Sequence, residues 1–275
     1  MFVQSVGLLG PGMGSWPAAQ AVLRGAAPHT AGKTRLTPPA RLPAAERRRA
    51  GDAIKLAMAV ADEAATLGAM DPQLLATVFT SSSGEGVNCH SICETLASDN
   101  RLISPTRFAN SVHNAPAGYW HIAVASRAPS TSLCAFNGGF AAGLIEAGSK
   151  VLSLQMPVLL VASDTPYPEP LHAARPLADS FGMALVLTPQ ATAQSLAALH
   201  IALVDASGAG PFSTCEDPSL ESLRANTPAA RALPLLQALA HGHGHGHGHE
   251  QGRQTLVIDY LPALSLQLDL TLAAR

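Results

Sequence analysis

Charged residues are scarce in this chain, and neither sign predominates. Asp, Glu, Lys and Arg make up 13% of the 275 residues, with 17 Lys plus Arg against 19 Asp plus Glu. A nucleic-acid surface needs a basic excess, which this balance does not provide. The sequence also lacks an uncharged apolar run of about 18 residues, the least that a membrane span requires. We therefore expect neither a nucleic-acid partner nor a membrane span.

Cysteine is scarce as well, and nothing at the N-terminus predicts a secretory leader. Residues 1–9 (MFVQSVGLL) carry no basic stretch of the kind that opens such a leader. Four cysteines are too few for a disulfide scaffold. Both absences favour reduced thiols in a cytoplasmic protein. The cysteines are Cys89, Cys93, Cys134 and Cys215.

Two segments carry residue types that ligate metals. In His241–His249, five histidines alternate with four glycines, and neutral imidazoles bind Zn²⁺, Ni²⁺ or Cu²⁺. A glycine-spaced loop offers no rigid frame for the ligands, so we interpret 241–249 as a mobile insertion. A metal-binding protein built around it stays an alternative. Cys89, His90 and Cys93 have no second cluster at zinc spacing, and we interpret the two thiols as buried. We predict no metal site and no cofactor.

Strand-like and helix-like patterns alternate along the chain. Apolar, β-branched runs that end in turn residues predict strands, and apolar residues at helical spacing predict helices. Strands are predicted over 2–9, 74–80, 130–135, 158–162 and 183–187, and with a weaker pattern over 199–204, 256–260 and 264–272. Helices are predicted over 46–68, 115–126 and 231–240, and over the small-residue stretch after Gly139. The alternation predicts an α/β fold with a mixed, mostly parallel sheet covered by helices.

The run Ser81–Gly86 (SSSGEG) follows a predicted strand, where a nucleophile or a phosphate cradle could lie. It lacks the Gly-x-Ser-x-Gly pattern of a nucleophile elbow, and no Gly-Lys-Ser/Thr follows to complete a P-loop. We interpret it as a turn between a strand and a helix.

Residues 104–147 are the most informative segment. They contain the run SPTRFANSVHNAPAG, then Arg-Ala-Pro-Ser at 127–130, then a small-residue helix ending in Glu146-Ala147. In this combination, residues 2–190 resemble the N-terminal half of the β-ketoacyl synthases, and most closely the short chain length factors that accompany aryl polyene and related pigment clusters. The resemblance implies a thiolase-like half-fold, with one domain over 1–190 and a variable, irregular extension over 191–275 packed on it.

The resemblance also locates the position of the nucleophile. Condensing enzymes place a cysteine at the start of a buried helix, where the helix dipole favours the thiolate. An ungapped register between residues 127 and 147 puts Asn137 at that position, and an amide is not a nucleophile at neutral pH. Cys134 lies three residues upstream, within the predicted strand, where we interpret it as a buried core thiol. We therefore assign no catalytic residue, with Cys134 as the alternative nucleophile.

The family takes its catalytic histidines from a second, similar half, for which 275 residues leave no room. His113, His121, His172 and His200 match none of those catalytic positions. We interpret each of them as a partnered or surface histidine.

A non-catalytic subunit of the chain length factor type is the function that the resemblance implies. It would pair with a full-length ketoacyl synthase, as a heterodimer or higher hetero-oligomer, in polyene or fatty-acid-like biosynthesis, and would meet acyl carrier protein through that complex. Candidates to shape the partner's acyl tunnel are Phe136, Asn137 and Phe140. Candidates to pair with the partner's strand are Ser130, Thr131, Ser132 and Leu133. The alternative is a stand-alone acyl-transferring or condensing enzyme that uses Cys134.

Overall fold

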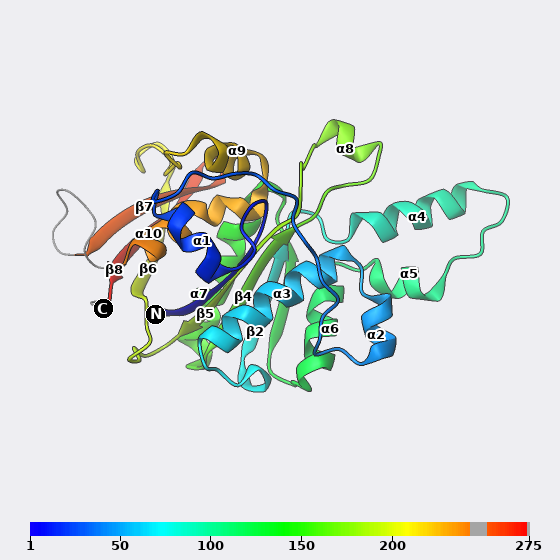
Figure 1. The fold of residues 1–275 in the computed structure, drawn as a ribbon, viewed down its shortest axis with the longest axis horizontal. Helices are drawn as coiled ribbons and strands as arrows, with labels where there is room; N and C mark the ends of the chain where they lie inside the picture. The colour runs from blue at the N-terminus through cyan, green and yellow to red at the C-terminus, as the bar shows by residue number, and fades with distance from the viewer. Residues whose placement is uncertain (243–251, 274–275) are drawn as a thin grey trace.

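One mixed sheet runs through the protein (Figure 1). It has eight strands, in the order β3-β2-β4-β5-β1-β6-β8-β7. The computed structural model describes residues 1–242 and 252–273. The strands are β1 (Phe2–Leu9), β2 (Ala76–Ser81), β3 (Ser130–Cys134), β4 (Val158–Asp164), β5 (Phe181–Thr188), β6 (Ala197–Asp205), β7 (Arg253–Leu261) and β8 (Leu264–Leu272). The α-helices are α1 (Trp16–Leu23), α2 (Ala44–Arg49), α3 (Asp52–Leu67), α4 (Gly86–Ala97), α5 (Pro105–Asn110), α6 (Ala115–Val124), α7 (Gly139–Leu154), α8 (Leu171–Ala174), α9 (Pro218–Asn226) and α10 (Leu233–His241). Three short 3-10 helices are η1 (Pro72–Leu74), η2 (Phe136–Gly138) and η3 (Pro228–Ala232). None of the helices within the described ranges is long and apolar enough to cross a membrane.

The sheet is mixed, as predicted, but the expectation of mostly parallel pairing is wrong. β2 is parallel to β3 and β4, whereas the five other pairings are antiparallel. A parallel neighbour needs a long crossover, usually a helix. Such helices connect β2 to β3 and β3 to β4, but between β4 and β6 the only helix is the short α8. β7 and β8 are joined by Pro262 and Ala263 alone, so they must form an antiparallel hairpin.

The expected irregular extension over 191–275 instead contains regular elements. β6 continues the sheet by pairing Ala197 and Ala198 with Val3 and Phe2 of β1, and β8 and β7 follow outward. The weak strand patterns at 199–204, 256–260 and 264–272 are thereby confirmed. A domain boundary at residue 190 stays a prediction. Residues 243–249 of the predicted histidine-glycine insertion lie outside the described residues.

The predicted helix over 46–68 forms as two helices. α2 ends at Arg49, and Ala50 takes extended backbone angles (φ −65°, ψ 114°) before Gly51 caps α3. From Ile54 to Ala61 the apolar residues then recur at helical spacing on a buried face. The periodicity predicts this face correctly, but it does not reveal the break before it.

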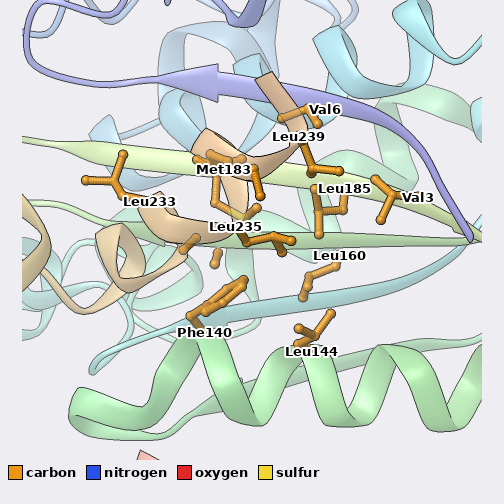
Figure 2. Close-up of a cluster of buried hydrophobic side chains, with 14 of the residues drawn as sticks. Val3, Val6, Phe140, Leu144, Leu160, Met183, Leu185, Leu233, Leu235 and Leu239 are labelled. Carbon is orange, nitrogen blue, oxygen red and sulfur yellow. The ribbon is translucent and has the colours of Figure 1, made fainter. Parts of the chain in front are cut away.

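Helices cover both faces of the strands from β2 to β1. α3 and α6 bury one face, with Trp120 of α6 fully enclosed. On the other face, Figure 2 shows Phe140 and Leu144 of α7 and Leu235 of α10 packed around strand residues such as Leu160. Burying one such side chain contributes about 1.5–3 kcal/mol. α7 and α10 also contact β7, so these helices lie between the central strands and the C-terminal ones, and the start of α7 is firmly placed.

α4 and α5, with the chain between and just after them, form a lobe over residues 86–112 that projects from the body of the protein (Figure 1). α4 has no buried residue and contacts α5. Apolar side chains that this α4–α5 lobe exposes are Val87, Leu96, Leu102, Phe108 and Val112. An amphipathic helix normally buries its apolar stripe. In this lobe, apolar side chains are instead exposed to solvent.

Candidate functional site

The position implied for the nucleophile lies where β3 turns into α7. Cys134 ends β3, η2 covers Phe136–Gly138, and α7 begins at Gly139. Asn137 is exposed on this turn, while Phe140, one helical turn further on, is 1% exposed in the core. Phe136 and Asn137 therefore point away from the side of α7 that Phe140 fills. Whether these three residues shape an acyl tunnel stays a prediction.

Small residues let the start of α7 approach β2 closely, as the sequence suggests. A Cβ atom on Gly139 would lie 3.2 Å from the carbonyl oxygen of Ser81, and one on Gly143 would lie 2.6 Å from Cγ2 of Thr80. Oγ1 of Thr80 donates a hydrogen bond to the Gly139 carbonyl oxygen at 2.9 Å. The first turns of α7 are thus held against the end of β2.

Arg175, which follows α8, contacts the side chains of Asn137 and Phe136. Its Nη2 donates a hydrogen bond of 2.6 Å to Oδ1 of Asn137, and its guanidinium carbon lies 3.7 Å from the centre of the Phe136 ring. The Tyr167 ring is 5.7 Å away. Sequence reasoning missed Arg175, because it stands 38 residues from Asn137 in a proline-rich segment without a periodic pattern.

Below this cluster, the fully buried carboxylate of Asp164 joins three segments. Oδ1 accepts a hydrogen bond from the Ser82 N–H at 2.7 Å, and Oδ2 accepts one from the Ala229 N–H at 2.8 Å. Burial raises the pKa of Asp164, although the hydrogen bonds and the charge of Arg175 oppose the rise. Asp164 thus ties the end of β4 to the turn after β2 and to η3.

The run Ser81–Gly86 is the predicted turn between a strand and a helix, since β2 ends at Ser81 and α4 begins at Gly86. The phenolic oxygen of Tyr167 hydrogen bonds with Oγ of Ser82 and accepts a bond of 3.1 Å from Oγ of Ser83. The turn therefore holds Tyr167 beside Arg175 and forms part of the wall around Asn137.

Glu85 caps α4 and provides a test of the site's electrostatics. Its Oε2 accepts a hydrogen bond of 2.6 Å from the Asn88 N–H. Burial raises the pKa of Glu85; the bond to Asn88 and the charge of Arg107 oppose the rise, and Asp52 adds to it. Between the unfolded-state pKa and this higher native pKa, the native protein binds more protons. The free energy of unfolding therefore falls as pH rises through that window.

We expect the stability of the Glu85→Gln variant, taken relative to wild type at the same pH, to increase as pH rises through that window. Glutamine keeps an oxygen that accepts the Asn88 hydrogen bond, but it does not titrate. Urea unfolding of both proteins, at a series of pH values from about 4 upward, measures the difference in slope. Parallel pH profiles would contradict the prediction.

The chain matches a known protein family over most of its length. A family model described as the N-terminal domain of β-ketoacyl synthases matches residues 16–245, most of the chain. The chain belongs to this β-ketoacyl synthase family. No curated protein matches the chain.

Solved ketosynthase structures share the thiolase-like fold at low sequence identity. The ketosynthase ApeO in complex with its chain length factor ApeC, from Xenorhabdus doucetiae, matches at 23% identity and a TM-score of 0.68, over 98% of this chain and 99% of that one. The ishigamide ketosynthase/chain length factor matches at 12% identity and a TM-score of 0.70, over 99% of both chains. A β-ketoacyl synthase from Burkholderia phymatum matches at 10% identity and a TM-score of 0.69, again over 99% of both chains.

The expectation that Cys134 is a buried thiol is wrong. This alternative nucleophile is exposed at the end of β3, before the helix start. Its Sγ lies 3.5 Å from Oγ of Ser81, which accepts a hydrogen bond from the Gly84 N–H at 2.8 Å. His113 touches the same turn through its Cβ, 3.0 Å from a Cβ placed on Gly84. Cys134 therefore lacks the helix N-terminus that would favour a thiolate.

Within residues 1–242 and 252–273, no histidine forms a hydrogen bond with Asn137, which is bonded to Arg175. His121 is held between Oγ1 of Thr77 at 3.1 Å and the Ser126 carbonyl oxygen at 3.3 Å. His200 is exposed on β6, with its Nδ1 3.6 Å from Asp269. His172 on α8 is half-buried, and its buried Nδ1 has no hydrogen-bond partner among the described residues, so the expectation of a partnered or surface histidine is wrong for it. His121 and His200 therefore have the partnered and surface settings expected of them.

The expectation that Cys89 and Cys93 are buried is wrong. Both thiols are exposed on α4, because this helix belongs to the projecting lobe and has no buried residue. His90, between them, pairs with Glu94 at 3.3 Å. Cys215 is the buried thiol, and burial raises its pKa to about 12. Within 1–242 and 252–273, no three His, Cys, Asp or Glu side chains gather where they could hold a metal.

β3, which carries the four interface candidates, is an edge strand of the sheet. It pairs with β2 on one side, with Ser132 opposite Phe79 in the middle of the register. Oγ1 of Thr131 donates a hydrogen bond of 2.8 Å to Glu146 of α7. The side chains of Thr131, Ser132 and Leu133 are half-buried, and Ser130 is exposed. The outer edge of β3 is open to a further strand.

Proposed function

We propose that this chain is a non-catalytic, chain length factor type subunit that pairs with a ketosynthase. The observation that carries the proposal is the Asn137 amide, in the turn just before α7, hydrogen bonded to Arg175. At this position a condensing enzyme of the family has a cysteine thiolate. An amide cannot form the acyl-enzyme, and a guanidinium bonded to it fills the adjacent space. The thiol and the histidines of the reaction would come from the partner.

Two surfaces support a partner subunit. β3 leaves one edge unpaired, and such an edge readily accepts another strand. The α4–α5 lobe leaves the body at Gly84, next to Cys134 at the end of β3, and exposes large apolar side chains. A subunit that adds a strand at β3 would also lie within reach of this lobe. The matched structures include ketosynthases in complex with a chain length factor, which is the arrangement that we propose for this chain.

The resemblance to chain length factors also supports a proposal for the partner, the carrier protein and the pathway. The partner is a full-length ketoacyl synthase, acyl carrier protein reaches the complex through that partner, and the pathway makes aryl polyene or fatty-acid-like chains in the cytoplasm. Reconstitution with a ketosynthase, acyl carrier protein and malonyl thioester tests these assignments together. Condensation that requires both chains supports them.

We expect the isolated chain to form no covalent acyl adduct when it is incubated with an acyl thioester. Asn137 cannot attack a thioester, and Cys134 lies outside the helix start that would activate it. Intact-mass measurement, followed by peptide mapping, detects an adduct if one forms. Cys89 and Cys93, which are also exposed, report non-enzymatic acylation of surface thiols in the same peptide map, and a Cys134→Ser variant verifies that an adduct mapped to residue 134 is on its thiol. An adduct at Cys134 that accumulates and then turns over would favour the stand-alone enzyme instead.

A further inference from the structure

Phe136 combines two features that are unfavourable on their own. Its φ is +50°, in the left-handed region that bulky residues rarely adopt. Its side chain is 61% exposed, so burial does not compensate for the strained backbone. Strained residues of this kind persist where neighbouring groups hold them, and they cluster at functional sites. The Phe136 N–H donates a hydrogen bond of 3.0 Å to the Ser82 carbonyl oxygen, which holds the backbone. It is the exposed ring that requires a further neighbour.

Arg175 is that neighbour. Its guanidinium lies over the face of the Phe136 ring, at the distance of a cation–π contact. It also donates a hydrogen bond to the side chain of the next residue, Asn137. Among the ion pairs of the described residues, none involves Arg175. Its positive charge acts on the ring, on the amide, on the buried Asp164 and, as a like charge, on Arg231. Tyr167, held by the two serines of the turn after β2, flanks it on the other side.

We propose that Arg175 is a specificity-determining positioning residue: by clamping Phe136 and Asn137, it fixes the aromatic surface that limits the acyl chain growing on the partner ketosynthase. This inference rests on the proposed function. η2 directly follows the edge strand β3, so the clamped ring lies beside the surface assigned to the partner. Arg175 acts on the acyl chain only through Phe136. Without the contact to Arg175, the exposed Phe136 ring can rotate out of the position that limits the chain.

The position of the guanidinium can be tested without any partner. In an Asn137→Cys variant, a nearby guanidinium favours the thiolate and speeds alkylation by iodoacetamide near neutral pH. We expect Arg175→Met in the same background to slow alkylation at residue 137 by roughly threefold or more, with each cysteine followed separately by peptide mapping. Arg48→Ala removes an exposed arginine of α2 and serves as the control for net charge. Equal rates at residue 137 with and without Arg175 would overturn the clamp.

The specificity role is tested in the assembled complex. We expect Arg175→Met and Phe136→Ala to form the complex normally and to lengthen the main product by one elongation cycle or more, with Arg175→Lys intermediate and Arg48→Ala unchanged. Mass spectrometry of the acyl carrier protein products measures the chain length. Assembled Arg175→Met and Phe136→Ala complexes with wild-type products would overturn the inference while the proposed function stands. A wild-type chain that assembles with no ketosynthase would overturn both.

Discussion

Replacing Asp164 by alanine should lower the free energy of unfolding by about 3 kcal/mol. The substitution leaves the N–H groups of Ser82 and Ala229 without an acceptor in a buried setting. It also disconnects the end of β4 from the turn that holds Tyr167 and from η3. Leaving a buried donor unsatisfied costs about 1–3 kcal/mol, and here two donors lose the same carboxylate. Urea unfolding followed by far-UV circular dichroism measures the loss.

A matched control separates this role from ordinary capping. Asp71 also accepts a backbone hydrogen bond, from the Gln73 N–H at 3.0 Å, but it is exposed. Asp71→Ala should cost about 1 kcal/mol, because water can replace the lost acceptor. Asp164→Asn should fall between wild type and Asp164→Ala, since an amide oxygen satisfies one of the two N–H groups. A similar loss for Asp164→Ala and Asp71→Ala would show that Asp164 does not join the three segments.

The strands could be placed from sequence because their signal is local. β1, β4 and β5 are apolar runs that are buried on both faces, and each ends near a turn residue. Their direction could not be placed, because it depends on the connections between them. The segment from Asp164 to Phe181 folds over the site without a long helix. It therefore returns the chain antiparallel, a result that no local pattern encodes.

The candidate site divides in the same way. The turn from β3 into α7 that carries Asn137 could be placed because patterns on both sides of it are local, and the small residues of α7 predict the close approach to β2. The equivalence of Asn137 to the nucleophile stays a prediction. Arg175 and Asp164 could not be linked to this turn. Their contacts with η2 and with the turn after β2 join segments that are far apart in sequence. The exposure of the α4–α5 lobe could not be predicted either. Apolar residues in a helix normally indicate that it is buried, and only the positions of the neighbouring elements show that α4 is not.

Ser132→Arg should weaken assembly with the ketosynthase by about 100- to 1,000-fold, if the partner adds a strand to β3 as proposed. Ser132 lies in the middle of the edge strand, opposite Phe79. A guanidinium there would be buried without a partner charge, which costs about 3–5 kcal/mol. Titration of the labelled chain with ketosynthase measures the affinity. Thr271→Arg adds the same charge to an exposed strand position on β8 and should leave the affinity unchanged.

The same interface predicts how the chain behaves alone. An obligate interface typically buries more than about 2,000 Å² in total. At about 25 cal/mol per Å², its apolar part contributes tens of kcal/mol before the costs of association. A domain of ordinary stability cannot leave such a surface in water without consequence. We therefore expect the isolated chain to self-associate through β3 and the α4–α5 lobe, and size-exclusion chromatography should show Ser132→Arg reducing that self-association. The stand-alone enzyme would become the better hypothesis if wild type and Ser132→Arg were both monodisperse monomers and neither bound the ketosynthase.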